Sequence, residues 1–241
     1  MIQKRRVLLG TPMYDRRADA GYIHSFGQTI KLCTDYGVDL RWLFPWGEVV
    51  QHARNKLVRD ALVSGFDDLI FVDSDQDWEP EWIVRLLSHP VDCVGVPVRK
   101  KTENGIAFNV MVRGGPLSIT TDPETGLMTA PDMSVGTGLL RLSRHAMQTL
   151  WDNSEEYTVH GSKEGPLHWI FEYGPWKGEL RSEDAAACQL LRAHGIPTWI
   201  DPTMNSGHMG VKRYWGDFRA EHAKWCEAAK APSKPELKVV G

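Results

Sequence analysis

Residues 69–75 read LIFVDSD, four apolar residues followed at once by two aspartates around a serine. A short apolar run is typical of a strand buried in a parallel sheet, and open α/β sheets bind ligands at the C-terminal ends of such strands. On an extended strand, Asp73 and Asp75 would face the same way, about 6.6 Å apart, so one ion could not be chelated symmetrically by both. Either the chain turns at Ser74, or one aspartate holds a metal while the other meets a ribose hydroxyl or a metal-bound water.

Simpler explanations of this acidic run are partly excluded by the sequence. A calcium loop starting at Asp73 would need Gly at its sixth position and Glu at its twelfth, where the chain has Trp78 and Val84. A phosphatase motif of the Asp-x-Asp-x-Thr type also fails, because Asp77 stands at the Thr position and the motif is not on the first strand. A solvated turn at the end of a strand remains the alternative to a metal-nucleotide site.

The composition limits the class of protein. A chain of 241 residues is long enough for one domain with a sizeable core, and a net charge of −3 gives no overall attraction to nucleic acid. No apolar stretch approaches the 18 or more residues of a membrane span, and residues 1–6 lead directly into a short strand, so we expect a cytoplasmic protein with no membrane partner. The four cysteines are widely spaced, which favours reduced, structural thiols.

The first hundred residues alternate between strand and helix patterns, which predicts a doubly wound, mainly parallel α/β sheet. The expected strands are 6–11, 38–44, 69–72 and 91–98, and the expected helices are 23–36, 50–62 and 79–88. Residues 102–133 lose the helical spacing and carry several glycines and prolines, which indicates a small antiparallel flap. Beyond it we expect a strand at 135–142, a helix at 144–151, a polar, aromatic-rich loop, a helix at 182–194, a strand at 198–200, a loop at 201–210 and a flexible tail at 231–241.

Three stretches together carry a family resemblance: VLLGTPMY (7–14), ARN (53–55) with the acidic strand, and residues 181–210. In their order and spacing they resemble a small, bacteriophage-type GT-A fold glycosyltransferase with a DxD motif, similar to family 2-like enzymes. The resemblance covers most of residues 5–212 and implies one catalytic domain over 1–230. It further implies a nucleoside-diphosphate sugar donor, UDP-sugar favoured, and a divalent metal, Mn²⁺ or Mg²⁺. Asp75 and His208 match the metal ligands, with Asp73 at the metal-bound water or the ribose.

These residue types suit such chemistry. A cation held by carboxylate oxygen neutralises the charge that develops on a leaving nucleoside diphosphate, and an imidazole in its shell favours manganese over magnesium. A surface histidine with no function is the alternative for His208. Its neighbours Gly207 and Gly210 favour a backbone that approaches a ligand closely.

Residues 182–184 (SED) have two explanations. Serine followed by two acids is ordinary chemistry for the start of a helix. In the family resemblance an acid at this place faces the acceptor, and a carboxylate at the acceptor hydroxyl would act as general base. We expect Asp184 to be the base, with Glu183 as its competitor. An enzyme that retains anomeric configuration would need no such base.

The resemblance also places part of the chain near the donor nucleotide. The donor-binding candidates are Thr11, Pro12, Tyr14, Arg54, Asn55, Asp73 and Arg99. A solvated helix face is the alternative for Arg54 and Asn55, a loop aromatic for Tyr14, and a solvated charge run for residues 99–101 (RKK).

The acceptor is the least determined part. A hydroxymethylated pyrimidine in phage DNA is one hypothesis, with residues 99–101 and 212–215 (KRYW) as phosphate and base contacts. A glycan or protein acceptor is the alternative, and Trp169, Trp176 and Trp215 could stack on sugars or on unpaired bases. A nucleotidyltransferase and a non-catalytic nucleotide-sugar-binding module are the rival functions. The glycine-rich, arginine-containing loop of a nucleotidyltransferase is absent after the first strand, where residues 9–13 read LGTPM.

Overall fold

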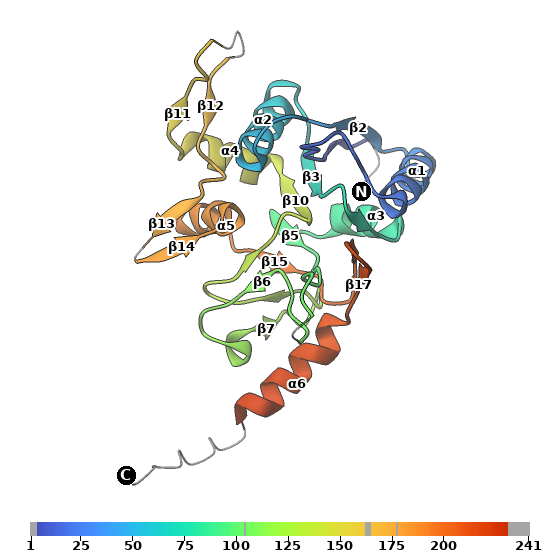
Figure 1. Cartoon of the computed structure of the whole chain (residues 1–241), viewed down its shortest axis with the longest axis vertical. Helices are drawn as coiled ribbons and strands as arrows, with labels where there is room; N and C mark the ends of the chain where they lie inside the picture. The colour runs from blue at the N-terminus through green and yellow to red at the C-terminus, as the bar shows by residue number, and fades with distance from the viewer. Residues whose placement is uncertain (1–3, 104, 162–164, 177, 231–241) are drawn as a thin grey trace.

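A computed structural model describes residues 4–103, 105–161, 165–176 and 178–230, and the tail expected at 231–241 lies outside them. An eight-stranded sheet with the order β2-β1-β3-β10-β5-β15-β8-β7 runs through the molecule (Figure 1). One strand, β10 (Leu139–Ser143), lies antiparallel between β3 and β5. Five core strands share one direction: β1 (Arg6–Gly10), β2 (Asp39–Leu43), β3 (Asp68–Val72), β5 (Cys93–Gly95) and β15 (Trp199–Ile200).

Helices cover both faces of this sheet because its buried strands alternate their side chains between two cores. On β1, Leu8 joins one hydrophobic cluster, whereas Val7 and Leu9 join the other. The Leu8 cluster is completed by α2 (Val50–Val63), α4 (Arg144–Asp152) and α5 (Glu183–Ala193), and the opposite one by α1 (Ala20–Asp35) and α3 (Glu81–Ser88). The two groups of helices lie on opposite sides of the strands in Figure 1. The predicted fold class, an α/β domain with a mainly parallel sheet flanked by helices, is confirmed.

The flap predicted for residues 102–133 is antiparallel, as expected. It contains β6 (Val110–Met111), the 3-10 turn η1 (Pro116–Ser118), β7 (Thr120–Thr121) and β8 (Met128–Thr129). β6 pairs with β9 (Ser134–Val135), while β7 and β8 pair with each other and extend the main sheet beyond β15. The flap therefore continues the central sheet rather than standing apart from it.

Two local expectations were wrong, and one helix was missed. Residues 201–210 are not only a loop, because β16 (Gly207–Met209) pairs with β4 (Gln76–Asp77) and β17 (Arg213–Tyr214). The aromatic-rich loop contains two small sheets, β11 (Glu156–Tyr157) with β12 (Leu167–His168) and β13 (Gly174–Trp176) with β14 (Glu179–Arg181). Strands of two or three residues are too short to show a periodicity. Helix α6 (Phe218–Lys230) was not predicted, because it buries only Phe218 and so has little apolar pattern.

None of the described helices combines the length and the apolar character needed to cross a bilayer.

Candidate functional site

The chain turns immediately after β3, which gives the two aspartates of the acidic motif different surroundings. The Gln76 N–H donates to the Asp73 carbonyl (3.2 Å), closing a turn over Ser74, and β4 follows. The Asp73 N–H donates to the Gly138 carbonyl (3.1 Å), whereas the Asp75 carbonyl accepts from the Met209 N–H (2.6 Å). The chain therefore turns at Ser74, and the two aspartate side chains meet different partners.

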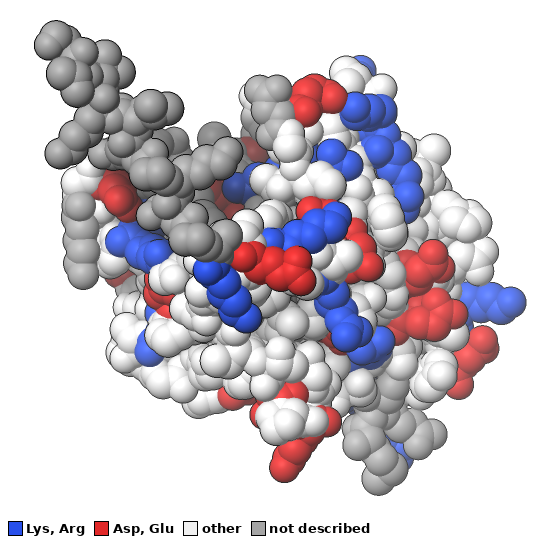
Figure 2. Space-filling view, turned by 90° about the horizontal axis from the view of Figure 1, so that it is seen from below, with Lys and Arg blue, Asp and Glu red and all other residues white. Residues whose placement is uncertain are grey.

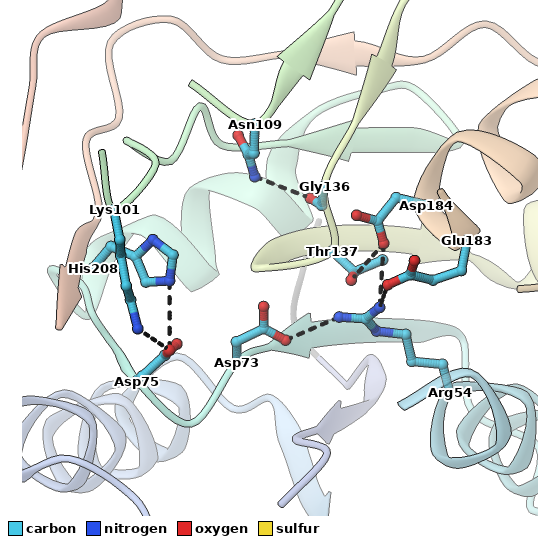
Figure 3. A network of polar contacts seen from close by, with 10 residues as sticks. All are labelled: Arg54, Asp73, Asp75, Lys101, Asn109, Gly136, Thr137, Glu183, Asp184 and His208. Atoms are coloured by element: carbon cyan, nitrogen blue, oxygen red, sulfur yellow. Dashed lines mark hydrogen bonds and ion pairs between the residues drawn. The ribbon is translucent and has the colours of Figure 1, made fainter. Parts of the chain in front are cut away.

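Arg54 gathers three carboxylates beside the end of β3 (Figure 3). From α2, its Nη1 donates to Glu183 Oε1 (2.6 Å) and to Asp184 Oδ1 (3.3 Å), and its Nη2 to Asp73 Oδ1 (3.2 Å). Burial lowers the pKa of Arg54, but the charges of the three carboxylates outweigh this and raise it above its ordinary value. One buried guanidinium thus holds together three acids from two distant segments.

Asp184 has a raised pKa. Burial raises its pKa to about 6, against the lowering effect of the Arg54 charge. The Thr137 hydroxyl donates to Asp184 Oδ1 (3.0 Å). Ser182 caps α5 by accepting from the Ala185 N–H (3.4 Å), so the capping role belongs to the serine, and both acids that follow contact Arg54. A carboxylate with a pKa near 6 is suited to accept a proton at neutral pH.

Asp75 and His208 form a second group with Lys101 (Figure 3). His208 Nε2 lies 3.5 Å and Lys101 Nζ 2.5 Å from Asp75 Oδ2. His208 Nδ1 donates to the Arg99 carbonyl (3.0 Å), so in the neutral ring Nε2 keeps its lone pair on the Asp75 side. Burial raises the pKa of Asp75, but its contacts with His208 and Lys101 more than offset this and lower it below its ordinary value.

The residues of this second group fit a divalent cation. Asp75 Oδ1 is buried and has no hydrogen-bond partner among the described residues. The other oxygen, Oδ2, already contacts a positive charge, the Lys101 ammonium. Carboxylate and imidazole are ligands that manganese accepts. No cluster of three or more His, Cys, Asp or Glu side chains arranged for a metal occurs in the described part of the chain. Magnesium-like ions commonly use one or two carboxylates and take their other ligands from substrate phosphates and water.

Short strands hold His208 in place. In β16 it pairs with Gln76 of β4 on one side and with Tyr214 of β17 on the other. Gly207 has a packing reason, because a Cβ at this position would collide with the Asp77 carboxylate. Arg213 in turn binds Asp77 with Nε and Nη2 (2.7 and 2.9 Å). The close approach expected around the glycines flanking His208 is therefore made to the protein's own side chains.

The other donor candidates differ in their surroundings. Asn55 is buried, where its Oδ1 accepts from the Phe171 N–H (3.0 Å) and its Nδ2 donates to the Tyr157 hydroxyl (3.3 Å). Thr11 is buried too, with its hydroxyl 2.7 Å from that of Tyr22. Arg99 donates to the Trp215 carbonyl (2.9 Å). Beyond β1, Pro12 is half-buried, whereas Tyr14 is 75% exposed.

Two residues of the site were not named as candidates from the sequence. Thr137 lies in the turn between β9 and β10, and the available signal was its setting in GTG (136–138). A Cβ at Gly138 would collide with the Gln76 amide, so the turn packs tightly against β4. Lys101 was noted only as part of a charge run, and nothing in the local sequence distinguishes it from Lys100.

No protein-family model matches the sequence, and a search of curated proteins gives no match. Several solved structures have a similar chain path. The A197 protein from STIV is 12% identical, with 89% of this chain and 91% of that chain covered and a TM-score of 0.49. A glycosyltransferase involved in the glycosylation of the major capsid of PBCV-1 is 11% identical (59% and 62% covered, TM-score 0.32). The 4-diphosphocytidyl-2C-methyl-D-erythritol synthase of Anaerococcus prevotii is 8% identical (65% and 78% covered, TM-score 0.33). These are distant likenesses.

Proposed function

We propose that this protein is a metal-dependent glycosyltransferase that moves a sugar from a nucleoside-diphosphate donor to an acceptor hydroxyl. The observation that carries the proposal is the juxtaposition in Figure 3 of two differently built groups. In one group, Asp75 and His208 lie beside the Lys101 ammonium. The other group contains Asp184, a buried carboxyl with a pKa of about 6. Asp73 connects the two groups, because it stands two residues before Asp75 in the chain and its carboxylate is ion-paired with Arg54.

Asp75 and His208 would hold the cation, with Mn²⁺ favoured by the imidazole and Mg²⁺ as the alternative. When bound, the cation would neutralise the charge of the departing diphosphate. The hydrogen bond from His208 Nδ1 to the Arg99 carbonyl fixes the ring so that Nε2 faces Asp75. Lys101 lies beside the same carboxylate and can pair with a phosphate oxygen once a cation takes its place.

Asp184 is the group we assign as general base for an inverting transfer. It accepts hydrogen bonds from Thr137 and Arg54, which fix its orientation, and its pKa of about 6 allows it to take up the proton of the acceptor hydroxyl. Glu183 makes the shorter contact with Arg54 (2.6 Å) and is the alternative base. The positive charge of Arg54 offsets the repulsion between the carboxylates of Asp73, Glu183 and Asp184, so that they can lie close together.

The experiment that tests this proposal is a panel of nucleotide sugars, UDP-sugars first, incubated with the protein and manganese. We expect slow release of free nucleoside diphosphate from one donor, loss of that release with a chelator, and loss with Asp75→Ala. Donor binding without release would instead identify a nucleotide-sugar-binding module. Release of pyrophosphate from a nucleoside triphosphate and a sugar phosphate would identify a nucleotidyltransferase.

A further inference from the structure

Two adjoining grooves lie along α2 and α5, the helices that carry Arg54 and the acids Glu183 and Asp184. One, of about 630 Å³, is lined by Ala186, Gln189 and Leu190 of α5, and the other, of about 590 Å³, by Gln51 and His52 of α2. Neither groove includes the four carboxylates of the site. Trp169 and Tyr173 line both grooves, which are here together called the aromatic groove. The aromatic groove thus runs along the two helices that supply side chains to the site, Arg54 from α2 and Asp184 from α5.

The aromatic groove exposes two large rings to solvent. Trp169 is 45% exposed although the Tyr157 ring stacks on it, with centroids 4.3 Å apart and an angle of 23° between the planes. Tyr173 is 55% exposed. Flat aromatic faces held rigidly at the surface are suited to pack against the apolar faces of sugar rings.

Polar side chains surround these rings. Arg181 Nη2 donates to Glu172 (2.6 Å) and Nη1 to Gln189 (3.3 Å), which holds all three in place, and Asn153 lies on the same wall. Fixed carboxylate, amide and guanidinium groups provide donors and acceptors for ligand hydroxyls. Arg181 Nε is buried and has no partner among the described residues.

The charge of the aromatic groove argues against a nucleic acid. Its lining contains Glu48, Glu155 and Glu172 but one arginine, and two of these acids are paired, Glu172 with that arginine and Glu48 with Lys56. A polyanion gains affinity from unpaired cations, and the described lining offers no unpaired lysine or arginine. Of the basic residues in the DNA hypothesis, Lys101 pairs with Asp75, Lys212 with Glu103 (2.7 Å) and Arg213 with Asp77. On the face seen from below, Figure 2 shows basic and acidic side chains intermingled rather than a continuous basic patch.

We infer that the aromatic groove binds the acceptor and that this acceptor is a neutral oligosaccharide. That the bound oligosaccharide is the acceptor rests on the proposed function. Its binding to the aromatic groove does not depend on that function. Trp169 and Tyr173 would carry the sugar rings, and Glu172, Gln189 and Arg181 would bind their hydroxyls.

The test is binding without any donor. An array of neutral and acidic glycans is screened with the wild-type protein, and the strongest ligand is titrated by calorimetry, beside a short single-stranded DNA. We expect a neutral oligosaccharide to bind, and Trp169→Ala and Tyr173→Ala each to weaken it about tenfold or more. Trp42→Ala is the matched control, because Trp42 is 44% exposed on β2 and lines neither groove.

Manganese-dependent binding of nucleoside diphosphate, measured on the same variants, separates this inference from the proposed function. It should be unchanged in Trp169→Ala and Tyr173→Ala, which also shows that they are folded. No neutral glycan binding, equal weakening by Trp42→Ala, or tighter binding of the DNA through Trp169 would overturn the inference. If glycans bind as expected but nucleoside diphosphate does not, the groove stands and the proposed function fails.

Discussion

Replacing Asp184 with asparagine should change how the stability of the protein depends on pH. Burial raises the pKa of this carboxyl from 3.8 to about 6, and each pKa unit corresponds to about 1.36 kcal/mol. Below about pH 4 the carboxyl is protonated in both the folded and the unfolded chain, so burial carries no charge penalty. As the pH rises from about 4 to about 6, the unfolded chain loses the proton first and the free energy of unfolding falls. Above pH 6 the full penalty, about 3 kcal/mol, is present.

Asparagine has the same shape, can still accept from Thr137 and Arg54 through its oxygen, and carries no charge. Asp184→Asn should therefore equal the wild type in stability near pH 4 and exceed it by about 3 kcal/mol at pH 7. Urea unfolding at a series of pH values measures this difference directly. Glu183→Gln is the control, because it also removes one carboxylate from Arg54 but leaves Asp184 in place. A difference between Asp184→Asn and wild type that does not grow between pH 4 and 6 would refute the assignment of a buried, charge-destabilised carboxyl.

Three further predictions concern the same residues. Asp184→Asn should lower turnover onto the acceptor about a hundredfold or more with donor binding intact, and the wild-type rate should rise with pH through about 6; if Glu183→Gln has this effect instead, the roles of the two acids are exchanged. Lys101→Met should bind Mn²⁺ about fivefold more tightly than the wild type, because the substitution removes a competing cation from Asp75. Electron paramagnetic resonance measures this binding, and weaker binding would contradict the view that Lys101 occupies the place of the metal. Arg54→Met should lower the free energy of unfolding by about 3–5 kcal/mol, because it leaves three acids together without their cation, and a loss below about 1 kcal/mol in urea unfolding would mean that they are solvated.

The parts of the fold that could be predicted are those with a repeating local pattern. The apolar run before Asp73 predicted the buried β3, and the alternation of strands and helices predicted the covered, mainly parallel sheet. The start of α6 did have a signal that was missed, because the Asp217 carboxylate accepts from the Ala220 N–H (3.2 Å) in an N-cap arrangement. The helix itself buries too little apolar surface for a periodic pattern.

The candidate site could be predicted only residue by residue, not as an arrangement. Family resemblance identified Asp75, His208 and Asp184 as candidates, but Arg54 meets Asp184 across 130 positions and Lys101 meets Asp75 across 26. Such contacts depend on the order of the strands in the sheet, which periodicity does not determine. Asn55 was predicted to bind the donor, but its side chain is buried and bonded to Tyr157 and Phe171. There it holds the segment that carries Trp169 and Tyr173 of the aromatic groove.

The most direct test of the central claim is a crystal structure with UDP and manganese, with data collected for the anomalous signal of the metal. We predict one manganese peak bonded to the Asp75 carboxylate, to His208 Nε2 and to diphosphate oxygens, with Lys101 moved from Asp75 to a phosphate. UDP bound with Lys101 still on Asp75 and no manganese at these residues would contradict the account.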